Sequence, residues 1–190
     1  MCGVGIAYNS KIAGLRILSG DISDVDEALA LNYAYQNTSI YSCSWGPSDD
    51  GRTMEAPSLL IQKAILEGIQ NGRGGKGSIF VFASGNGAPH GDQCNFDGYT
   101  NSIFSVTVAA VDYKGLHPYY SEACAANMVV TYSSGSGKSI VCICLPHSCL
   151  SSTPCIIIAY DRRWGKQMLF VPWRHFCCSP SRICSICVSS

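Results

Sequence analysis

The chain is poor in charge and has no surplus of either sign: 13 Lys and Arg stand against 13 Asp and Glu in 190 residues. Because no basic stripe is present, the composition argues against nucleic acid or an anionic membrane as a partner. No apolar run reaches the 18 residues or more that a membrane-spanning helix needs, and the first residues lack the features of a signal peptide. We therefore expect either a soluble protein or targeting elements outside this chain.

Cysteine is scarce before residue 140, with four of the 12 cysteines, and crowded after it. The segment 142–190 has a single acidic residue and no amphipathic helix of useful length. Three interpretations are open: a small disulfide module, a zinc site, or translation through an intron or in a shifted frame. The zinc ligands would be Cys142, Cys144, Cys184 and Cys187. The abrupt change of composition favours the third, which predicts a poorly ordered tail.

Before residue 142, apolar strand patterns alternate with helical ones. Strands are expected at 4–18, 40–45, 78–83, 103–111 and 128–133, and helices at 24–37 and 58–70. Ser23 is the expected N-cap of the first helix. The expected core-facing positions of the two helices are Val25, Leu29, Leu31 and Tyr35, then Leu59, Leu60, Ala64, Ile65 and Ile69. This order predicts an α/β fold with an open, mostly parallel sheet flanked by helices.

One strand, 78–83, stops abruptly in Ser84-Gly85-Asn86-Gly87. Parallel strands deliver their C-terminal ends to the site crevice, and Asn86 carries a neutral amide donor at that end. Two interpretations stay open from these residues alone. Asn86 is either a left-handed turn residue or a donor to an oxyanion.

Acidic residues also follow the strand ends: Asp49 and Asp50, Asp92 and Asp97, and Glu122. Carboxylates on neighbouring loops can coordinate a hard cation such as Ca²⁺ or receive a basic side chain. Each one taken singly is more often a solvated charge. Their common location is what favours a site.

Other loop residues are less specific. Cys94 and Cys124 are plausible disulfide partners in an oxidising compartment and ordinary thiols in a reducing one. His90 is expected to be a solvated loop histidine. The triplet Asn37-Thr38-Ser39 is a glycosylation acceptor if the chain is secreted.

Five motifs together resemble the kexin/furin branch of the subtilisin-like serine proteases, and most nearly the fungal kexins. They are CGVGIAYN at 2–9, IYSCSWGPSDDG at 40–51, FASGNG at 82–87, CNFDGYTNSI at 94–103 and YSEAC at 120–124. The resemblance implies a partial subtilisin-like catalytic domain over 1–141, followed by an irregular Cys-rich tail at 142–190. It also implies a calcium-dependent endopeptidase that cleaves proproteins after basic sites such as Lys-Arg or Arg-Arg. Such enzymes work in the secretory pathway (late Golgi) or at the cell surface.

The resemblance implies roles for individual residues of the substrate site. Asn86 would donate to the oxyanion, and Asp49 and Asp97 would be the acidic residues of an S1 pocket that receives arginine. The pocket walls would be Trp45, Gly46, Pro47, Ala83, Ser84 and Gly85. Glu27 and Glu55 match positions that receive a basic residue at P4.

It also implies two calcium sites and a disulfide. Asp49, Asp92 and Glu122 match the ligands of a site beside the S1 pocket. Gly3 matches a backbone ligand of a second site, and Cys94–Cys124 corresponds to a disulfide of the family.

The family's catalytic mechanism needs an Asp, a His and a Ser in recognisable motifs. None of the three motifs occurs in the 190 residues, and His147 with Ser148, Ser151 or Ser152 is ordinary tail composition. We therefore expect this chain to be inactive by itself. The alternative interpretation is a non-catalytic truncated decoy or binding protein that holds basic peptides or calcium through its acidic loops.

Overall fold

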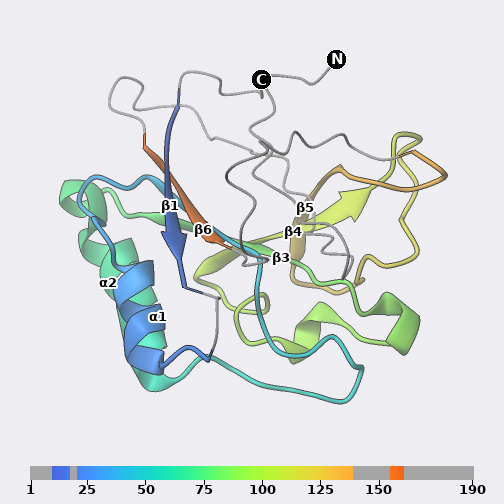
Figure 1. Ribbon diagram of the computed structural model, residues 1–190, viewed down its shortest axis with the longest axis horizontal. Coiled ribbons are helices and arrows are strands. Elements are labelled where there is room, and N and C mark those ends of the chain that lie inside the picture. Colours follow the sequence, from blue (N-terminus) through green and yellow to red (C-terminus); the bar gives the residue numbers. More distant parts are fainter. Residues whose placement is uncertain (1–9, 18–20, 139–154, 161–190) are drawn as a thin grey trace.

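The computed structural model describes residues 10–17, 21–138 and 155–160. Their strands form one sheet in the order β1-β6-β2-β3-β4-β5, with helices α1 and α2 side by side next to it (Figure 1). The strands are β1 Lys11–Arg16, β2 Ile40–Cys43, β3 Ile79–Ala83, β4 Ser105–Val111, β5 Asn127–Tyr132 and β6 Cys155–Tyr160. The helices are α1 Asp24–Leu31 and α2 Leu59–Gly75, with 3₁₀ turns at Ala88–His90 and Cys94–Phe96.

The sheet is mostly parallel, as the sequence predicts. Strands β2, β3, β4 and β5 run parallel to one another, whereas β6 lies antiparallel between β1 and β2. The parallel half brings the C-terminal ends of β2, β3 and β4 to the same edge, where ligand sites of such sheets form. The α/β class is therefore confirmed.

Helix α1 begins as expected, because the Ser23 side chain accepts a hydrogen bond from the Asp26 amide at 3.1 Å. It ends at Leu31 rather than near residue 37. A turn follows in which Ala34 has a φ of 50° and the Thr38 hydroxyl donates to the Ala34 carbonyl at 3.0 Å. This local hydrogen bond competes with continued helix, which is a common effect of threonine.

The expected core face of α1 is wrong in part. Val25 and Leu29 are 54% and 65% exposed, and the buried residues of the helix are Glu27, Ala28, Ala30 and Leu31. The two alanines are small, so α1 can approach α2 closely, and apolar size is a poor guide to such a contact.

Helix α2 differs from expectation in a similar way at its first turn. Leu59 and Leu60 are 74% and 45% exposed, whereas Ile61, Ala64 and Ile65 are buried. Gly68 lies against the sheet, where an added Cβ would come within 2.8 Å of the Phe80 ring. The helical geometry breaks at Gly72, close to the expected end of the helix at residue 70.

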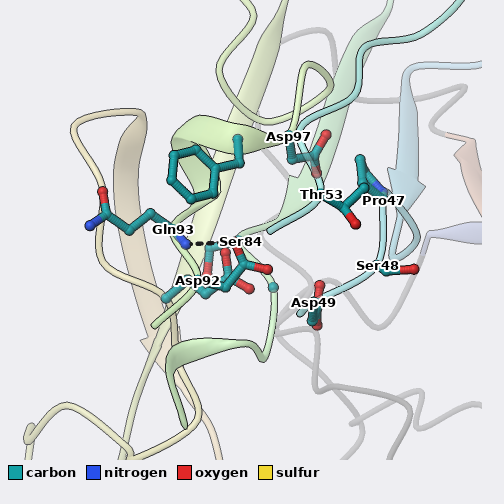
Figure 2. A pocket seen from close by; sticks show the side chains of 11 residues that line it. Pro47, Ser48, Asp49, Thr53, Ser84, Asp92, Gln93 and Asp97 are labelled. Carbon is teal, nitrogen blue, oxygen red and sulfur yellow. Dashed lines mark hydrogen bonds between the residues drawn. The ribbon is translucent and has the colours of Figure 1, made fainter. Parts of the chain in front are cut away.

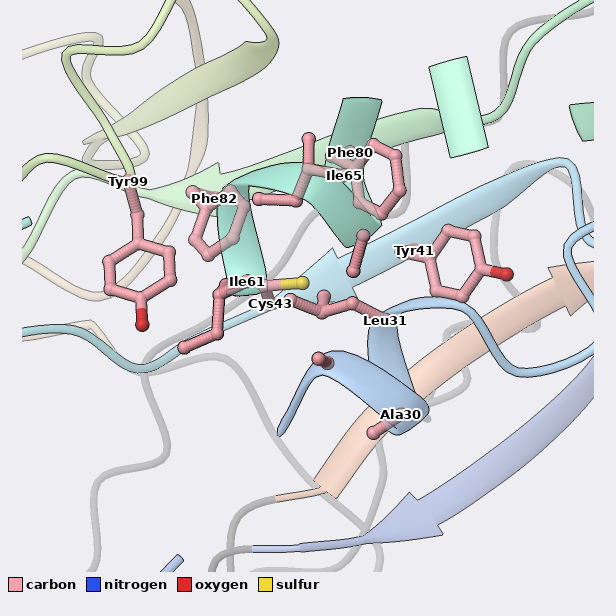
Figure 3. Close-up of a cluster of buried hydrophobic side chains, with 11 residues drawn as sticks. Ala30, Leu31, Tyr41, Cys43, Ile61, Ile65, Phe80, Phe82 and Tyr99 are labelled. Atoms are coloured by element: carbon pink, nitrogen blue, oxygen red, sulfur yellow. The ribbon is translucent and has the colours of Figure 1, made fainter. Parts of the chain in front are cut away.

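Buried rings join the helices to the centre of the sheet (Figure 3). Tyr41 and Phe80 stack with centroids 4.8 Å apart, and Phe82 packs against Tyr99 at 5.2 Å. Leu31 of α1 and Ile61 of α2 belong to the same cluster. Strands β2 and β3 are therefore anchored by a buried cluster of side chains.

Strand β6 lies within 142–190, a segment for which the sequence patterns predict no regular element. The expectation is therefore wrong for these six residues. Gly3, and with it the second calcium site, lies outside the described residues. So do Cys142, Cys144, Cys184 and Cys187 and the residues from His147 to Ser152. Within the described ranges, neither helix is long and apolar enough to cross a membrane.

Candidate functional site

The loops that follow β2, β3 and β4 meet at one edge of the sheet and line a pocket (Figure 2). Four carboxylates face this pocket: Asp49 after β2, Asp92 and Asp97 after β3, and Glu122 after β4. Neighbouring carboxylates disfavour one another's charged form, and a cation or a basic ligand offsets this repulsion. The arrangement therefore suits a positively charged partner.

Asn86 is exposed and lies in the loop that follows β3, beside this pocket. Its main-chain amide donates to Asp49 Oδ2 at 2.9 Å. Among the described residues, the positive φ angles outside glycine belong to Ala34, Arg73 and Ser136, so Asn86 is not left-handed. Gly85, with a φ of 102°, makes the turn instead. The interpretation of Asn86 as a left-handed turn residue is therefore wrong.

Three of the carboxylates form a tight cluster. Asp49, Asp92 and Glu122 each offer an oxygen, and these oxygens lie within 4.8 Å of one another. Backbone amides orient all three: Asn86 donates to Asp49 at 2.9 Å, Gln93 to Asp92 at 2.8 Å and Gly87 to Glu122 at 2.8 Å. Cation-binding carboxylates need such preorganisation.

The negative charge of this cluster contributes to a raised pKa of Glu122. Burial, followed by the negative charges of Asp49 and Asp92, raises the pKa of Glu122 from 4.5 to about 7, against the opposing hydrogen bond from Gly87. A carboxyl that resists ionisation in this way gains most from a nearby cation. The cluster is therefore chemically suited to a hard divalent ion.

Asp97 lies apart from the cluster, on the wall of the same pocket. Burial raises the pKa of Asp97 to about 6, although its carboxylate accepts a hydrogen bond from the Tyr99 amide at 2.7 Å. Gly46 faces it so closely that an added Cβ would lie 2.6 Å from Asp97 Oδ2. The absence of a side chain at Gly46 leaves this carboxylate in place.

The expected pocket walls are only partly assembled as predicted. Pro47, Ser84 and Gly85 line the pocket, and Gly46 contacts it through Asp97. Ala83 is the last residue of β3 and does not line it.

Trp45 does not line the pocket and is hydrogen-bonded to Glu27, a carboxylate outside it. Its Nε1 donates to Glu27 Oε1 at 3.0 Å, and the Tyr99 hydroxyl donates to the same oxygen at 2.7 Å. Glu27 is only 6% exposed. It thus links α1 to the loops on both sides of the pocket.

Glu55 is exposed and reaches the site through its main chain. It forms an isolated parallel bridge with Asp97, and its carbonyl accepts a hydrogen bond from Gly98 at 2.8 Å. The loops that carry Glu55 and Asp97 are therefore held together. Neither Glu27 nor Glu55 lines the acidic pocket itself.

The predicted disulfide between Cys94 and Cys124 is present, with the two Cα atoms 5.6 Å apart. It ties the loop of Asp92 and Asp97 to the segment that carries Glu122. Two of the three loops of the site are therefore joined covalently.

Several residues near the site were not singled out by the sequence patterns. The polar or aromatic lining residues Ser48, Thr53, Gln93 and Phe96 belong to this group, as does Tyr99 beside Glu27. Tyr99 follows Asp97 within the Asp-Gly-Tyr motif, which was the one available signal. His90 is exposed, as expected, and its Nδ1 also lies 2.9 Å from the main-chain oxygen of Asp49.

The family model described as "Subtilase family" matches residues 1–163 of this chain. Among individual proteins, kexin of Saccharomyces cerevisiae is 61% identical over 139 residues, which cover 73% of this chain and 17% of the relative. The dibasic-processing endoprotease of Schizosaccharomyces pombe is 61% identical over 141 residues, covering 74% of this chain and 20% of the relative. Human proprotein convertase subtilisin/kexin type 7 is 54% identical over 134 residues, covering 70% and 17%.

The matched segment spans a fifth or less of the length of these relatives. The similarity nevertheless covers most of the present chain. It includes the loops that carry Asp49, Asn86 and Glu122.

Proposed function

The chain belongs to the subtilase family, in its kexin-like branch of proprotein convertases, and from this premise we propose that it forms the basic-residue pocket of a serine endopeptidase. The proposed substrates are proproteins cleaved after paired basic residues. The observation that carries the proposal is the convergence of Asp49, Asp92, Asp97 and Glu122 on one pocket beside Asn86.

Asp97 and Asp49 are the proposed acceptors for an arginine side chain at P1. A guanidinium is planar and can pair with two carboxylate oxygens, which an ammonium does less well. The raised pKa of Asp97 supports this assignment, because a buried carboxyl with an elevated pKa gains most from an incoming cation. Gly46, Pro47, Ser84 and Gly85 are the proposed walls.

Asn86 is the proposed oxyanion-hole donor. Its exposed position in the loop that follows β3, next to the pocket, supports this role. An amide there can donate to the oxygen of a tetrahedral intermediate, and loss of one such donor typically costs about 10²–10³ in rate.

Calcium is the proposed occupant of the cluster of Asp49, Asp92 and Glu122. Its preferred ligands are carboxylate and carbonyl oxygens, and the spacing and orientation of these three groups fit it. When bound, the ion supplies positive charge that keeps the three carboxylates ionised. With Asp49 and Glu122 engaged in this way, Asp97 is left as the main partner for the substrate.

Glu27 and Glu55 are the proposed acceptors for a basic residue at P4. Trp45 and Tyr99 fix the carboxylate of Glu27, which supports a positioned rather than a mobile acceptor. Glu55 is exposed and flanks Asp97 through the bridge described above.

We place the end of the partial catalytic domain at residue 141 and treat 142–190 as a separate tail. The family match runs on to residue 163, so sequencing of the mature transcript across 141–163 tests this boundary directly.

We also propose a secretory-pathway or cell-surface location. The 190 residues carry no recognisable triad motif, so we propose that this chain binds substrate without hydrolysing it.

A calorimetric titration tests the binding function. The purified chain, with calcium present, is titrated with a peptide ending in Lys-Arg and with the same peptide ending in Lys-citrulline. Citrulline has nearly the shape of arginine and no charge. We expect clear binding of the arginine peptide and much weaker binding of the citrulline peptide. Equal affinities would contradict the proposal, and hydrolysis of the arginine peptide would contradict the proposed inactivity.

A further inference from the structure

Asn37-Thr38-Ser39 lies in the turn between α1 and β2, away from the acidic pocket. It is the only Asn-X-Ser/Thr triplet with a permitted middle residue in the 190-residue sequence. Nothing in the proposed protease site uses it. This uniqueness makes the triplet a clear test case, because any N-linked glycan must attach here.

The turn presents Asn37 while burying its neighbour. Asn37 is exposed, whereas Thr38 is fully buried. The Thr38 hydroxyl donates to the carbonyl oxygens of Tyr33 and Ala34. The main-chain N–H of Asn37 donates to the carbonyl oxygen of Ala34 at 2.7 Å. The backbone of the triplet is thus fixed from within. A group attached to the Asn37 side chain can extend into solvent without disturbing these bonds.

The position of the turn keeps such a group away from the site. The triplet immediately precedes Ile40, the first residue of β2, whereas the pocket begins beyond Cys43, where β2 ends. The main-chain oxygen of Ser39 accepts a hydrogen bond from Ile79, the first residue of the parallel strand β3. The triplet therefore lies at the N-terminal ends of these two parallel strands, whereas Asp49 and Asn86 follow their C-terminal ends.

We propose that Asn37 is an N-glycosylation site and that its glycan covers the end of the sheet opposite to the substrate pocket. The co-reactant is an oligosaccharide carried on a polyisoprenyl diphosphate. Asn37 Nδ2 forms a bond to the anomeric carbon of the sugar, the bond from that carbon to the diphosphate oxygen breaks, and the lipid diphosphate leaves. The amide nitrogen loses one proton to a base of the transferase. The inference rests on the proposed secretory location.

The test is translation of the complete chain behind a cleavable signal peptide in the presence of microsomes. Protease protection first identifies the imported chain, and removal of glycan by peptide N-glycosidase then gives the readout. We expect one glycosidase-sensitive shift in the wild-type chain and in Ser39→Thr, which retains the acceptor hydroxyl. Asn37→Gln and Ser39→Ala should lose the shift.

An imported wild-type chain without the shift would overturn the inference, and so would a shift that survives Asn37→Gln. Both results leave the peptide-binding function untouched, because that function is measured separately with the arginine and citrulline peptides. Conversely, a failed peptide titration does not alter the glycosidase readout. The glycosylated chain should bind the arginine peptide as tightly as the unglycosylated chain, since the glycan lies at the N-terminal ends of β2 and β3.

Discussion

Asp49 Oδ2 accepts a hydrogen bond from the main-chain amide of Asn86 at 2.9 Å, and this bond joins the loop after β2 to the loop after β3. The same carboxylate belongs to the cluster of three acidic groups. One residue thus couples the orientation of the Asn86 segment to the charge of the proposed cation site. Changes at Asp49 should consequently affect more than one property of the site.

We expect Asp49→Ala to weaken calcium binding and arginine-peptide binding together. It removes one cation ligand and one carboxylate of the pocket, and it leaves the Asn86 amide without its acceptor. The calcium affinity measured by calorimetry should fall by about tenfold or more, as for loss of a charged ligand. Asp21 is exposed and does not line the pocket, so Asp21→Asn is the control. A variant Asp49→Ala with unchanged calcium affinity would remove Asp49 from the cation site.

The pH dependence of stability should follow Glu122. The pKa of this carboxyl is about 7 in the folded chain, whereas an unfolded chain releases the proton near 4.5. Between these values the folded state holds more protons, so the free energy of unfolding falls as the pH rises. The contribution of Glu122 to the free energy of unfolding is complete below pH 4.5. It is lost as the pH rises past the pKa of about 7 in the folded chain.

Thermal denaturation without calcium tests this point. We expect a lower melting temperature at about pH 8 than at about pH 5, and a smaller difference in Glu122→Gln, which cannot ionise. Calcium should restore the melting temperature of the wild type at the higher pH, because the ion favours the ionised cluster. An equal drop in Glu122→Gln would show that another group controls the effect.

His90 should support the Asp49 loop through one nitrogen. A carbonyl oxygen only accepts, so the 2.9 Å contact requires a proton on Nδ1. Asn can place an amide donor near the position of Nδ1, whereas Gln places it near Nε2. We therefore expect His90→Asn to keep the calcium affinity and His90→Gln to lower it severalfold in the same titration. Equal affinities in the two variants would mean that the contact does not position Asp49.

Gly85 should tolerate no side chain. Its φ of 102° is unfavourable for other residues, and an added Cβ would run into the carboxylate of Glu122. We expect Gly85→Ala to cost about 1–3 kcal/mol or more from backbone strain alone, seen as a lower midpoint in denaturant. Gly14 in β1 has open space around an added Cβ, so Gly14→Ala should leave the midpoint nearly unchanged. Similar midpoints for the two variants would contradict the close packing at Gly85.

The sequence predicted the parallel part of the fold because its strands are continuous apolar runs with clear ends. The strand before Asn86 and the N-cap at Ser23 are examples. Periodicity failed for Val25 and Leu59, because the helix contact uses small residues such as Ala28 and Gly68 that carry little apolar signal. Tertiary packing decided which face was buried.

The site was predicted in a similar way. The position of acidic residues after strand ends indicated the cluster, and the family motifs indicated Asp97. The contact from His90 to Asp49 and the bonds from Trp45 and Tyr99 to Glu27 could not be predicted. They depend on how separate loops pack together, and the sequence spacing of these residues carries no information about that.

The central claim is that the Asp97 carboxylate faces the guanidinium of the substrate. A double-mutant cycle measures this pair directly, with Asp97→Asn in the protein and citrulline for arginine in the peptide, both titrated with calcium present. We predict that Asp97→Asn lowers the affinity for the arginine peptide by about tenfold or more and barely changes the affinity for the citrulline peptide. The two changes are then strongly coupled. If the two changes instead weaken binding independently, Asp97 does not contact the substrate arginine.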